Sequence, residues 1–141
     1  MRNLVKRKLK AGKPSVGTWI TVGHPDISMY LADVGFDWLV CDMEHSPYGP
    51  ETYHFMVQAM LYNRANCMPM ARVPWNDLVW IKKVLDAGAT GLVIPRVDTA
   101  DMAREAEVFP VLAQATDRFP SWSAMETPTV IPRSLKDPEG F

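Results

Sequence analysis

The densest group of chemically active side chains in this sequence is Asp42-Met43-Glu44-His45. A carboxylate beside a histidine can fix the imidazole tautomer and stabilise its charged form, so that the histidine acts as a general base. The alternative is that Asp42 only caps a loop and that His45 is simply solvated. The group follows an apolar run where a buried strand should end, and this position leaves both interpretations open.

Arg72 stands at the end of a second apolar run, Met68-Pro69-Met70-Ala71. A guanidinium group there can bind a carboxylate or an enolate oxygen through paired hydrogen bonds. The alternative is an ion pair with a carboxylate at a neighbouring strand end, such as Asp42. We favour the ligand-binding role, because an unpaired charge at an inward position is costly.

Three other residues, Glu44, His54 and Cys41, carry groups that could do chemistry. Glu44 could bind a metal ion together with His24 and His45, but two separate loops would have to converge, so this is the less favoured use. His54 lies beside the apolar face of a predicted helix and is interpreted as a surface residue. Cys41 lies within a predicted buried strand and is interpreted as an inert thiol.

These residues belong to an alternation of predicted strands and helices. Strands are expected over residues 16–22, 37–42, 68–73 and 91–95, and helices over 4–10, 99–109 and the three segments between the strands. Apolar residues at helical spacing predict the buried faces of those three helices. They are Ile27, Tyr30, Leu31 and Val34 in the first; Tyr53, Met56, Val57, Met60 and Leu61 in the second; and Leu78, Ile81, Val84 and Leu85 in the third.

The order of these elements predicts an α/β fold with a parallel sheet. Residues 31–40 and 85–94 both read as a helix end, a glycine and a buried strand, which is the repeating unit of a barrel. An open doubly wound sheet is the alternative, although no glycine-rich nucleotide-binding motif follows the first strand. Reactive groups gather at the carboxyl ends of parallel strands, so one edge should hold the polar residues His24, Asp42, Glu44, His45, Arg72, Asn76, Asp77 and Arg96.

Composition limits the class of protein. The 141 residues carry a formal net charge of −1, which leaves no electrostatic footprint for nucleic acid. There is no apolar run of about 20 residues for a membrane span, and the basic N-terminus lacks the apolar segment of a secretory signal. Two cysteines cannot build a disulfide framework. We therefore expect a cytoplasmic protein that acts on small molecules.

Several ordered motifs together resemble those of the HpcH/HpaI aldolase family, over residues 3 to about 106. The motifs are Asn3-x-x-Lys6-x-x-Leu9-x-x-Gly12-x-x-x-x-Gly17-x-Trp19; Gly35-Phe36-Asp37-Trp38-Leu39-Val40-x-Asp42-x-Glu44-His45; Ala71-Arg72-Val73-Pro74-Trp75-Asn76-Asp77; and Ile81-Lys82-x-x-Leu85-Asp86-x-Gly88-Ala89-x-Gly91-Leu92-Val93-Ile94-Pro95. The resemblance implies a (β/α)8 TIM barrel and a lyase that joins or separates a pyruvate enolate and an aldehyde, commonly as a homo-oligomer.

The resemblance also implies roles for particular residues. Arg72 and Trp19 would bind the 2-oxo acid, and His45, oriented by Asp42, would handle the proton of the aldol hydroxyl. A divalent cation, magnesium or manganese, would stabilise the enolate. In the family its carboxylate ligands follow later strands, and we assign them to no residue of this chain, neither Glu126 nor Asp137.

The resemblance ends before the chain does. Residues 1–109 are expected to form about four β–α units, half of an aldolase barrel, and residues 110–141 a proline-rich, irregular tail in which a helix over 111–118 is one option. A truncated aldolase of this kind should have impaired activity. The alternatives are a non-catalytic half-barrel that self-associates or complements a partner fragment, and a metal- or ligand-binding module built on His24, Glu44 and His45.

Overall fold

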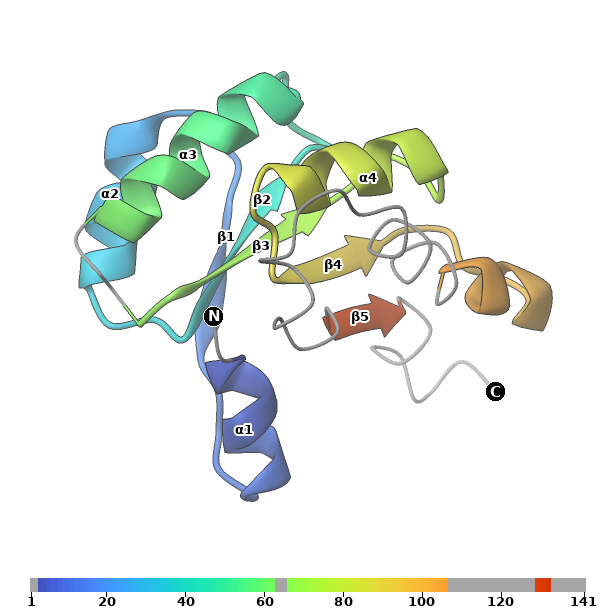
Figure 1. Ribbon diagram of the computed structural model, residues 1–141, viewed down its shortest axis with the longest axis horizontal. Helices are drawn as coiled ribbons and strands as arrows, with labels where there is room; N and C mark the ends of the chain where they lie inside the picture. The colour runs from blue at the N-terminus through green and yellow to red at the C-terminus, as the bar shows by residue number, and fades with distance from the viewer. Residues whose placement is uncertain (1–2, 63–65, 107–128, 133–141) are drawn as a thin grey trace.

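Helices and strands alternate along the chain (Figure 1) in a computed structural model that describes residues 3–62, 66–106 and 129–132. The elements are α1 (Leu4–Lys10), β1 (Gly17–Ile20), α2 (Pro25–Asp33), β2 (Trp38–Asp42), α3 (Pro50–Tyr62), β3 (Met68–Arg72), α4 (Leu78–Asp86), β4 (Gly91–Ile94) and β5 (Thr129–Pro132). Residues 100–106 form a further helical segment after β4.

The strands form one parallel sheet in the order β1-β2-β3-β4-β5. Helices α2, α3 and α4 connect successive strands and lie along the same face of the sheet (Figure 1). Strand order that follows chain order, with every connecting helix on one face, is the arrangement of a (β/α)8 barrel and differs from a doubly wound sheet, which has helices on both faces. The predicted partial barrel is therefore confirmed.

Strand β5 corrects one expectation for the tail. Residues 129–132 pair in parallel with β4, with Gly91 opposite Thr129 and Ile94 opposite Pro132. No strand was predicted after residue 109, because a four-residue run between prolines carries little sequence signal; pairing with the free edge of β4 supplies what the local sequence lacks. The expected helix over 111–118 and the end of the expected helix over 99–109 lie outside the described residues. The division at residue 109 stays a prediction.

Alternation along the strands separates two buried clusters. One side carries residues such as Leu39, Ala71 and Leu92, which pack against Tyr53, Met56 and other residues of the helices. The other side carries Val40, Met70 and Val93, with the partly buried Trp19 and Trp38 against them. Successive strand residues point to opposite faces, so Asp42 and Arg72, two positions beyond Val40 and Met70, belong to this second, inner face.

The buried face of α2 differs from the expected one. Ser28 and Ala32 are its buried residues, and of the expected face only Leu31 packs partly on the core, while Ile27, Tyr30 and Val34 are 40%, 62% and 70% exposed. The Ser28 hydroxyl donates to the carbonyl oxygens of Pro25 and Met56, at 2.7 and 3.2 Å, so a polar group that is fully buried is also satisfied. Small side chains four residues apart let α2 approach α3 closely, and this contact outweighs the apolar pattern that the sequence shows.

The other two helix faces largely follow the prediction. In α3 the side chains of Tyr53, Met56, Val57 and Met60 are buried, and Leu61 packs partly against them. In α4 Ile81, Val84 and Leu85 are buried, whereas Leu78 at its first turn is 40% exposed. The amphipathic pattern of both helices therefore does orient them on the sheet.

Helix α1 lies at the amino-terminal edge of the sheet. The Leu4 backbone N–H donates to Met68 Sδ at the start of β3, and Lys8 forms an ion pair with Asp37, which precedes β2. The hydrogen bond from Lys8, reinforced by one from the Val16 N–H, lowers the pKa of the Asp37 carboxyl. No helix in the described parts of the chain has the length and apolar character to cross a membrane.

Candidate active site

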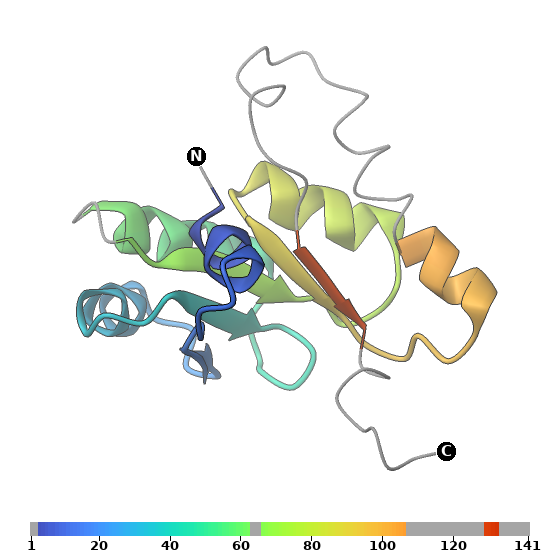
Figure 2. The ribbon, with the colours of Figure 1, turned by 90° about the horizontal axis from the view of Figure 1, so that it is seen from below.

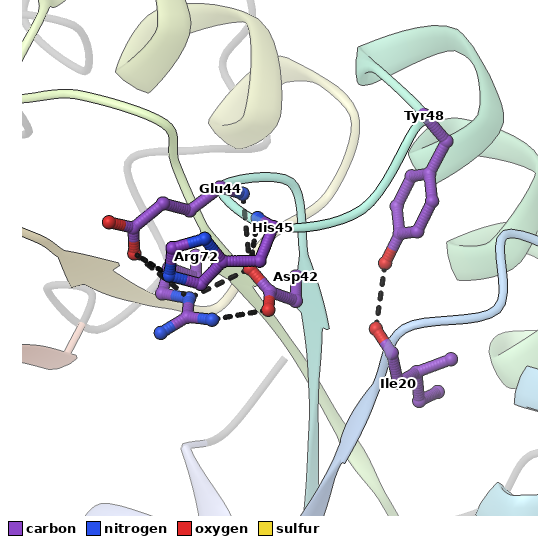
Figure 3. A network of polar contacts seen from close by, with 6 residues as sticks. All are labelled: Ile20, Asp42, Glu44, His45, Tyr48 and Arg72. Carbon is purple, nitrogen blue, oxygen red and sulfur yellow. Dashed lines mark hydrogen bonds and ion pairs between the residues drawn. The ribbon is translucent and has the colours of Figure 1, made fainter.

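Asp42 and Arg72 lie opposite each other at the carboxyl ends of β2 and β3. Arg72 Nε donates to Asp42 Oδ1 at 2.7 Å, and Arg72 Nη2 forms a second contact with Oδ2 (Figure 3). Two parallel N–H···O contacts fix both the distance and the plane of the guanidinium group. Arg72 therefore forms the ion pair with Asp42 that was the alternative to ligand binding, and it does so at the strand ends, where a ligand would also reach it.

The Asp42 carboxylate also holds the loop that follows β2. Its Oδ1 accepts hydrogen bonds from the backbone N–H groups of Glu44 at 3.0 Å and His45 at 3.3 Å, and its side chain is 3% exposed. Burial raises the pKa of this carboxyl, but the hydrogen bond from Arg72, the two backbone donors and the charge of Arg72 together lower it below its ordinary value. The same hydrogen bond raises the pKa of Arg72. Both groups are thus held in their charged forms.

Glu44 connects two of the residues for which chemistry was predicted, Arg72 and His45. Its Oε2 lies 3.3 Å from Arg72 Nε and 3.6 Å from His45 Nε2 (Figure 3). The Glu44 side chain is 13% exposed and that of His45 is 62% exposed. The imidazole therefore faces Glu44, whereas Asp42 binds only the backbone of His45. The structure thus places Glu44, and not Asp42, as the carboxylate beside the ring.

Trp19 lies against the guanidinium group of Arg72. The Cζ atom of Arg72 is 4.5 Å from the centre of the Trp19 ring, within the range of a cation–π contact. Trp19 also packs against the inner cluster of Val40, Met70 and Val93. The structure thus brings together all four predicted site residues, Trp19, Asp42, His45 and Arg72, on the inner face and carboxyl edge of the sheet.

Two further contacts hold the loops of this edge in place. The Tyr48 hydroxyl donates to the Ile20 carbonyl oxygen at 2.8 Å, which ties the loop after β2 to the end of β1 (Figure 3). After β3, Asp77 caps α4 by accepting from the Trp80 N–H at 3.0 Å. Burial is the main cause that raises the pKa of Tyr48, so its hydroxyl stays protonated and available as a donor.

The histidine that was considered for a metal site has another role. His24 caps α2, because its Nδ1 accepts from the Asp26 N–H at 3.2 Å. His24, Glu44 and His45 do not form a cluster, and the described residues hold no group of three or more His, Cys, Asp or Glu side chains that could bind a metal ion. The proposed three-ligand module is therefore wrong. Among the described residues, no donor set fits the divalent cation expected of the family.

Sequence reasoning missed two features of this edge. The bridging position of Glu44 could not be read from its spacing, because it depends on the register of β2 against β3. The second is a pair formed by Arg96 and Trp75, with Arg96 Cζ 5.0 Å from the ring centre. Arg96 was expected at the end of β4, but its aromatic partner comes from the loop after β3. The predictions for Cys41 and His54 hold: Cys41 is fully buried, with its pKa raised to about 12 by burial, and His54 is exposed.

Comparison with known proteins identifies the wider group. The family model for HpcH/HpaI aldolase/citrate lyase matches residues 15–118. A 4-hydroxy-2-oxo-heptane-1,7-dioate aldolase from Salmonella dublin is 42% identical over 106 residues, which are 75% of this chain and 40% of that protein. The chain thus spans about two fifths of the length of the curated relatives that it matches.

Solved structures agree with this match. An HpcH/HpaI aldolase/citrate lyase family protein from Burkholderia cenocepacia J2315 is similar with a TM-score of 0.80 and 25% identity, over 92% of this chain and 58% of that one. An HpcH/HpaI aldolase from Desulfitobacterium hafniense DCB-2 has a TM-score of 0.65 and 35% identity, over 73% and 39%. Sequence motifs, sheet topology and family match agree, and the chain belongs to the HpcH/HpaI aldolase/citrate lyase family.

Proposed function

We propose that this chain carries the pyruvate-binding part of an aldolase that cleaves or forms a carbon–carbon bond between a pyruvate enolate and an aldehyde. The observation that carries the proposal is the arrangement at one strand edge of a fixed guanidinium group, Arg72, and an exposed imidazole, His45, joined through Glu44. Relatives whose names specify a 4-hydroxy-2-oxo-heptane-1,7-dioate support this choice of substrate class.

The two groups divide the chemistry of cleavage between them. His45 takes the proton of the substrate's C4 hydroxyl, the C3–C4 bond breaks, and its electron pair moves into an enolate. Arg72 binds the 2-oxo acid and offsets the negative charge that develops on the enolate oxygen. The C4 carbon leaves as the aldehyde, and protonation of the enolate at C3 gives pyruvate. Glu44 beside the ring stabilises the imidazolium that forms in the first step.

The charges at this edge would favour an added cation, although the described residues supply no ligand set for the magnesium or manganese ion expected of the family. Asp42 and Glu44 contribute two negative charges against the single positive charge of Arg72. A bound 2-oxo acid adds another negative charge, so an added cation would lower the repulsion, and it would stabilise the enolate when bound. Turnover by the chain alone should nevertheless be slow, because the described residues supply no complete set of metal ligands.

Pyruvate release tests the proposal. The chain is incubated with 4-hydroxy-2-oxo-heptanedioate and Mg²⁺, and pyruvate is measured with a coupled lactate dehydrogenase assay. We expect slow release that falls about 100-fold in His45→Ala, as is typical when a general base is removed. His54→Ala is the matched control, since His54 is exposed on α3 and is not among the residues that contact Arg72 or His45, and it should leave the rate unchanged. Equal rates for wild type and His45→Ala contradict the proposal.

A non-catalytic half-barrel that self-associates or complements a partner fragment is the second candidate. It is favoured by the apolar side chains that α2 exposes, Ile27, Tyr30 and Val34. The same assay separates the two, because this candidate predicts no pyruvate release by wild type above the rate without protein. A homo-oligomer in the cytoplasm stays a prediction of the sequence.

A further inference from the structure

A second guanidinium group lies at the carboxyl edge of the sheet, beyond the one already described. Arg72 is the register partner of Val93 in β4, and Arg96 follows Val93 by three residues on the same chain segment. Strand β4 ends at Ile94, so Arg96 lies two residues beyond the end of its strand, whereas Arg72 is the last residue of β3. The two cations thus stand at different heights along neighbouring strands.

The backbone at Arg96 is unusual. Its φ is 57°, and among the described residues Arg96 is the sole non-glycine residue with a positive φ. This left-handed region suits glycine and is unfavourable for a residue with a Cβ atom. Such an outlier persists where the surrounding structure holds it, and outliers of this kind cluster at ligand sites. Backbone preference therefore does not explain why an arginine occupies this position, and its side chain is expected to have a function.

Arg96 is exposed and aligned on an aromatic ring. Its Cζ atom lies 5.0 Å from the centre of the Trp75 ring, and Trp75 is itself 52% exposed. Trp75 belongs to the loop after β3, which Asn76 links to the helical segment 100–106 through a hydrogen bond to the Met102 carbonyl oxygen at 3.3 Å. A flat ring on one side directs the guanidinium group while leaving its N–H donors open to the solvent.

The two arginines differ in their partners. Arg72 contacts both Asp42 and Glu44, whereas within the described ranges no carboxylate forms an ion pair with Arg96. A guanidinium group with open donors, held in place by an aromatic ring, suits a carboxylate. A ligand that meets both arginines must then be acidic at both ends.

We propose that Arg96, positioned by Trp75, binds the carboxylate of the aldehyde part of the substrate, which makes the chain selective for 4-hydroxy-2-oxo acids with a second, distal carboxylate. The inference rests on the proposed function, in which Arg72 holds the 2-oxo acid end. An extended seven-carbon chain separates its two carboxyl carbons by roughly 7–8 Å, a length that long arginine side chains at neighbouring strand ends can span. Arg96 contacts the substrate but takes no part in bond breaking.

Binding of a stable aldehyde analogue tests Arg96 directly. 4-Hydroxybutyrate has the carboxylate, and 1,4-butanediol has the same chain length without it. Each is titrated at low salt, and the indole N–H signal of Trp75, assigned with Trp75→Phe, is followed by NMR. We expect 4-hydroxybutyrate to bind at least tenfold more tightly than 1,4-butanediol to wild type, and Arg96→Gln to abolish the difference.

Two further variants separate binding from structure. Arg104→Gln removes the same charge from the neighbouring helical segment, where Arg104 pairs with Asp101, and it should keep the preference. Arg96→Gly removes the side chain at a position whose φ suits glycine, so it should lose the preference while melting at or above the wild-type temperature. Equal binding of both ligands to wild type, or equal losses in Arg96→Gln and Arg104→Gln, would overturn the inference.

Oxalate is a planar analogue of the pyruvate enolate. Its binding distinguishes a failure of the Arg96 inference from a failure of the proposed aldolase function. If oxalate binds to wild type and to Arg96→Gln alike while 4-hydroxybutyrate shows no dependence on Arg96, the distal carboxylate site is wrong and the pyruvate site stands. If oxalate does not bind but the Arg96-dependent preference remains, the anion site stands and the aldolase proposal fails.

Discussion

The guanidinium group of Arg72 contacts two carboxylates and one aromatic ring. Asp42 and Glu44 supply the charges, and Trp19 supplies the ring. A buried carboxylate with one cationic partner depends on that partner, because a lone charge in a low-dielectric site is costly. The pair therefore has two effects. It stabilises the ends of β2 and β3, and it fixes the guanidinium group in the orientation that a 2-oxo acid would meet.

The contribution of the Asp42–Arg72 pair to stability should fall in acid. The folded-state pKa of Asp42 is lowered, so its contribution to stability is complete above the ordinary aspartate value of about 3.9 and is lost as the pH falls through the lowered value. Asp42→Asn should reduce the free energy of unfolding at pH 7 by about 2–4 kcal/mol. It should also reduce the loss of stability between about pH 4 and pH 2. Urea unfolding at several pH values measures both effects.

Asp101 provides the control for this prediction. It pairs with Arg104 at the surface, and both side chains are largely exposed. Asp101→Asn should change the free energy of unfolding by less than about 1 kcal/mol at any of these pH values. Similar losses in the two variants would mean that the Asp42–Arg72 pair stabilises the protein no more than a surface pair does.

At the scale of the elements, the inner face of the sheet depends on a close approach between β1 and β2. Gly17 lies opposite Trp38 in the register, and a Cβ atom at Gly17 would collide with both the Trp38 ring and the Trp38 carbonyl oxygen. The carbonyl oxygen belongs to the backbone of a paired strand and cannot move aside easily. The same approach places Trp19, two residues farther along β1, beside Arg72.

Gly17→Ala should therefore destabilise the chain by about 1–3 kcal/mol, the usual cost of inserting a methyl group into a packed site. Thermal unfolding followed by circular dichroism measures the change. Gly49→Ala is the matched control, because a Cβ atom there meets nothing within 4 Å, and its melting temperature should stay within a few degrees of wild type. If the two alanine variants melt together, the close packing of β1 on β2 is not as described.

The elements also show what could be predicted from the sequence. The two repeats end as expected, with Gly35 and Gly88 at φ values of 106° and 107° after their helices, because the left-handed turn requires glycine. The buried face of α2 could not be predicted from the spacing of large apolar residues, because Ser28 and Ala32, which are buried there, are small and one of them is polar. Strand β5 could not be predicted either, because its pairing with β4 is a long-range contact.

The site was predictable to a similar degree. The positions of Asp42 and Arg72 at strand ends follow from apolar runs that stop there, and the parallel sheet brings those ends together. The partners of these residues depend on register and on loop geometry. For that reason the contacts of Glu44 with His45, and of Arg96 with Trp75, became visible only in three dimensions.

At the scale of the whole molecule, the candidate site and helix α1 lie at opposite ends of the strands. Helix α1 covers the amino-terminal edge through Leu4 and Lys8, as Figure 2 shows from below, with α1 in front of the strands. The carboxyl edge carries Trp19, Asp42 and Arg72 from three successive strands, followed by His45 in the loop. In barrels of this type the carboxyl edge holds the reactive groups, and the opposite edge contributes to stability.

Oxalate titration of the ¹⁵N-labelled chain, followed at the Arg72 Nε–H signal, tests the central claim that this edge binds a pyruvate enolate. The signal is assigned with Arg72→Lys, which keeps the charge but lacks the planar donor pair. We expect a saturable shift of that signal in wild type and at least tenfold weaker binding of oxalate by Arg72→Lys, while Arg104→Lys binds as wild type does. An Arg72 signal that does not move, or equal binding by all three proteins, contradicts the account.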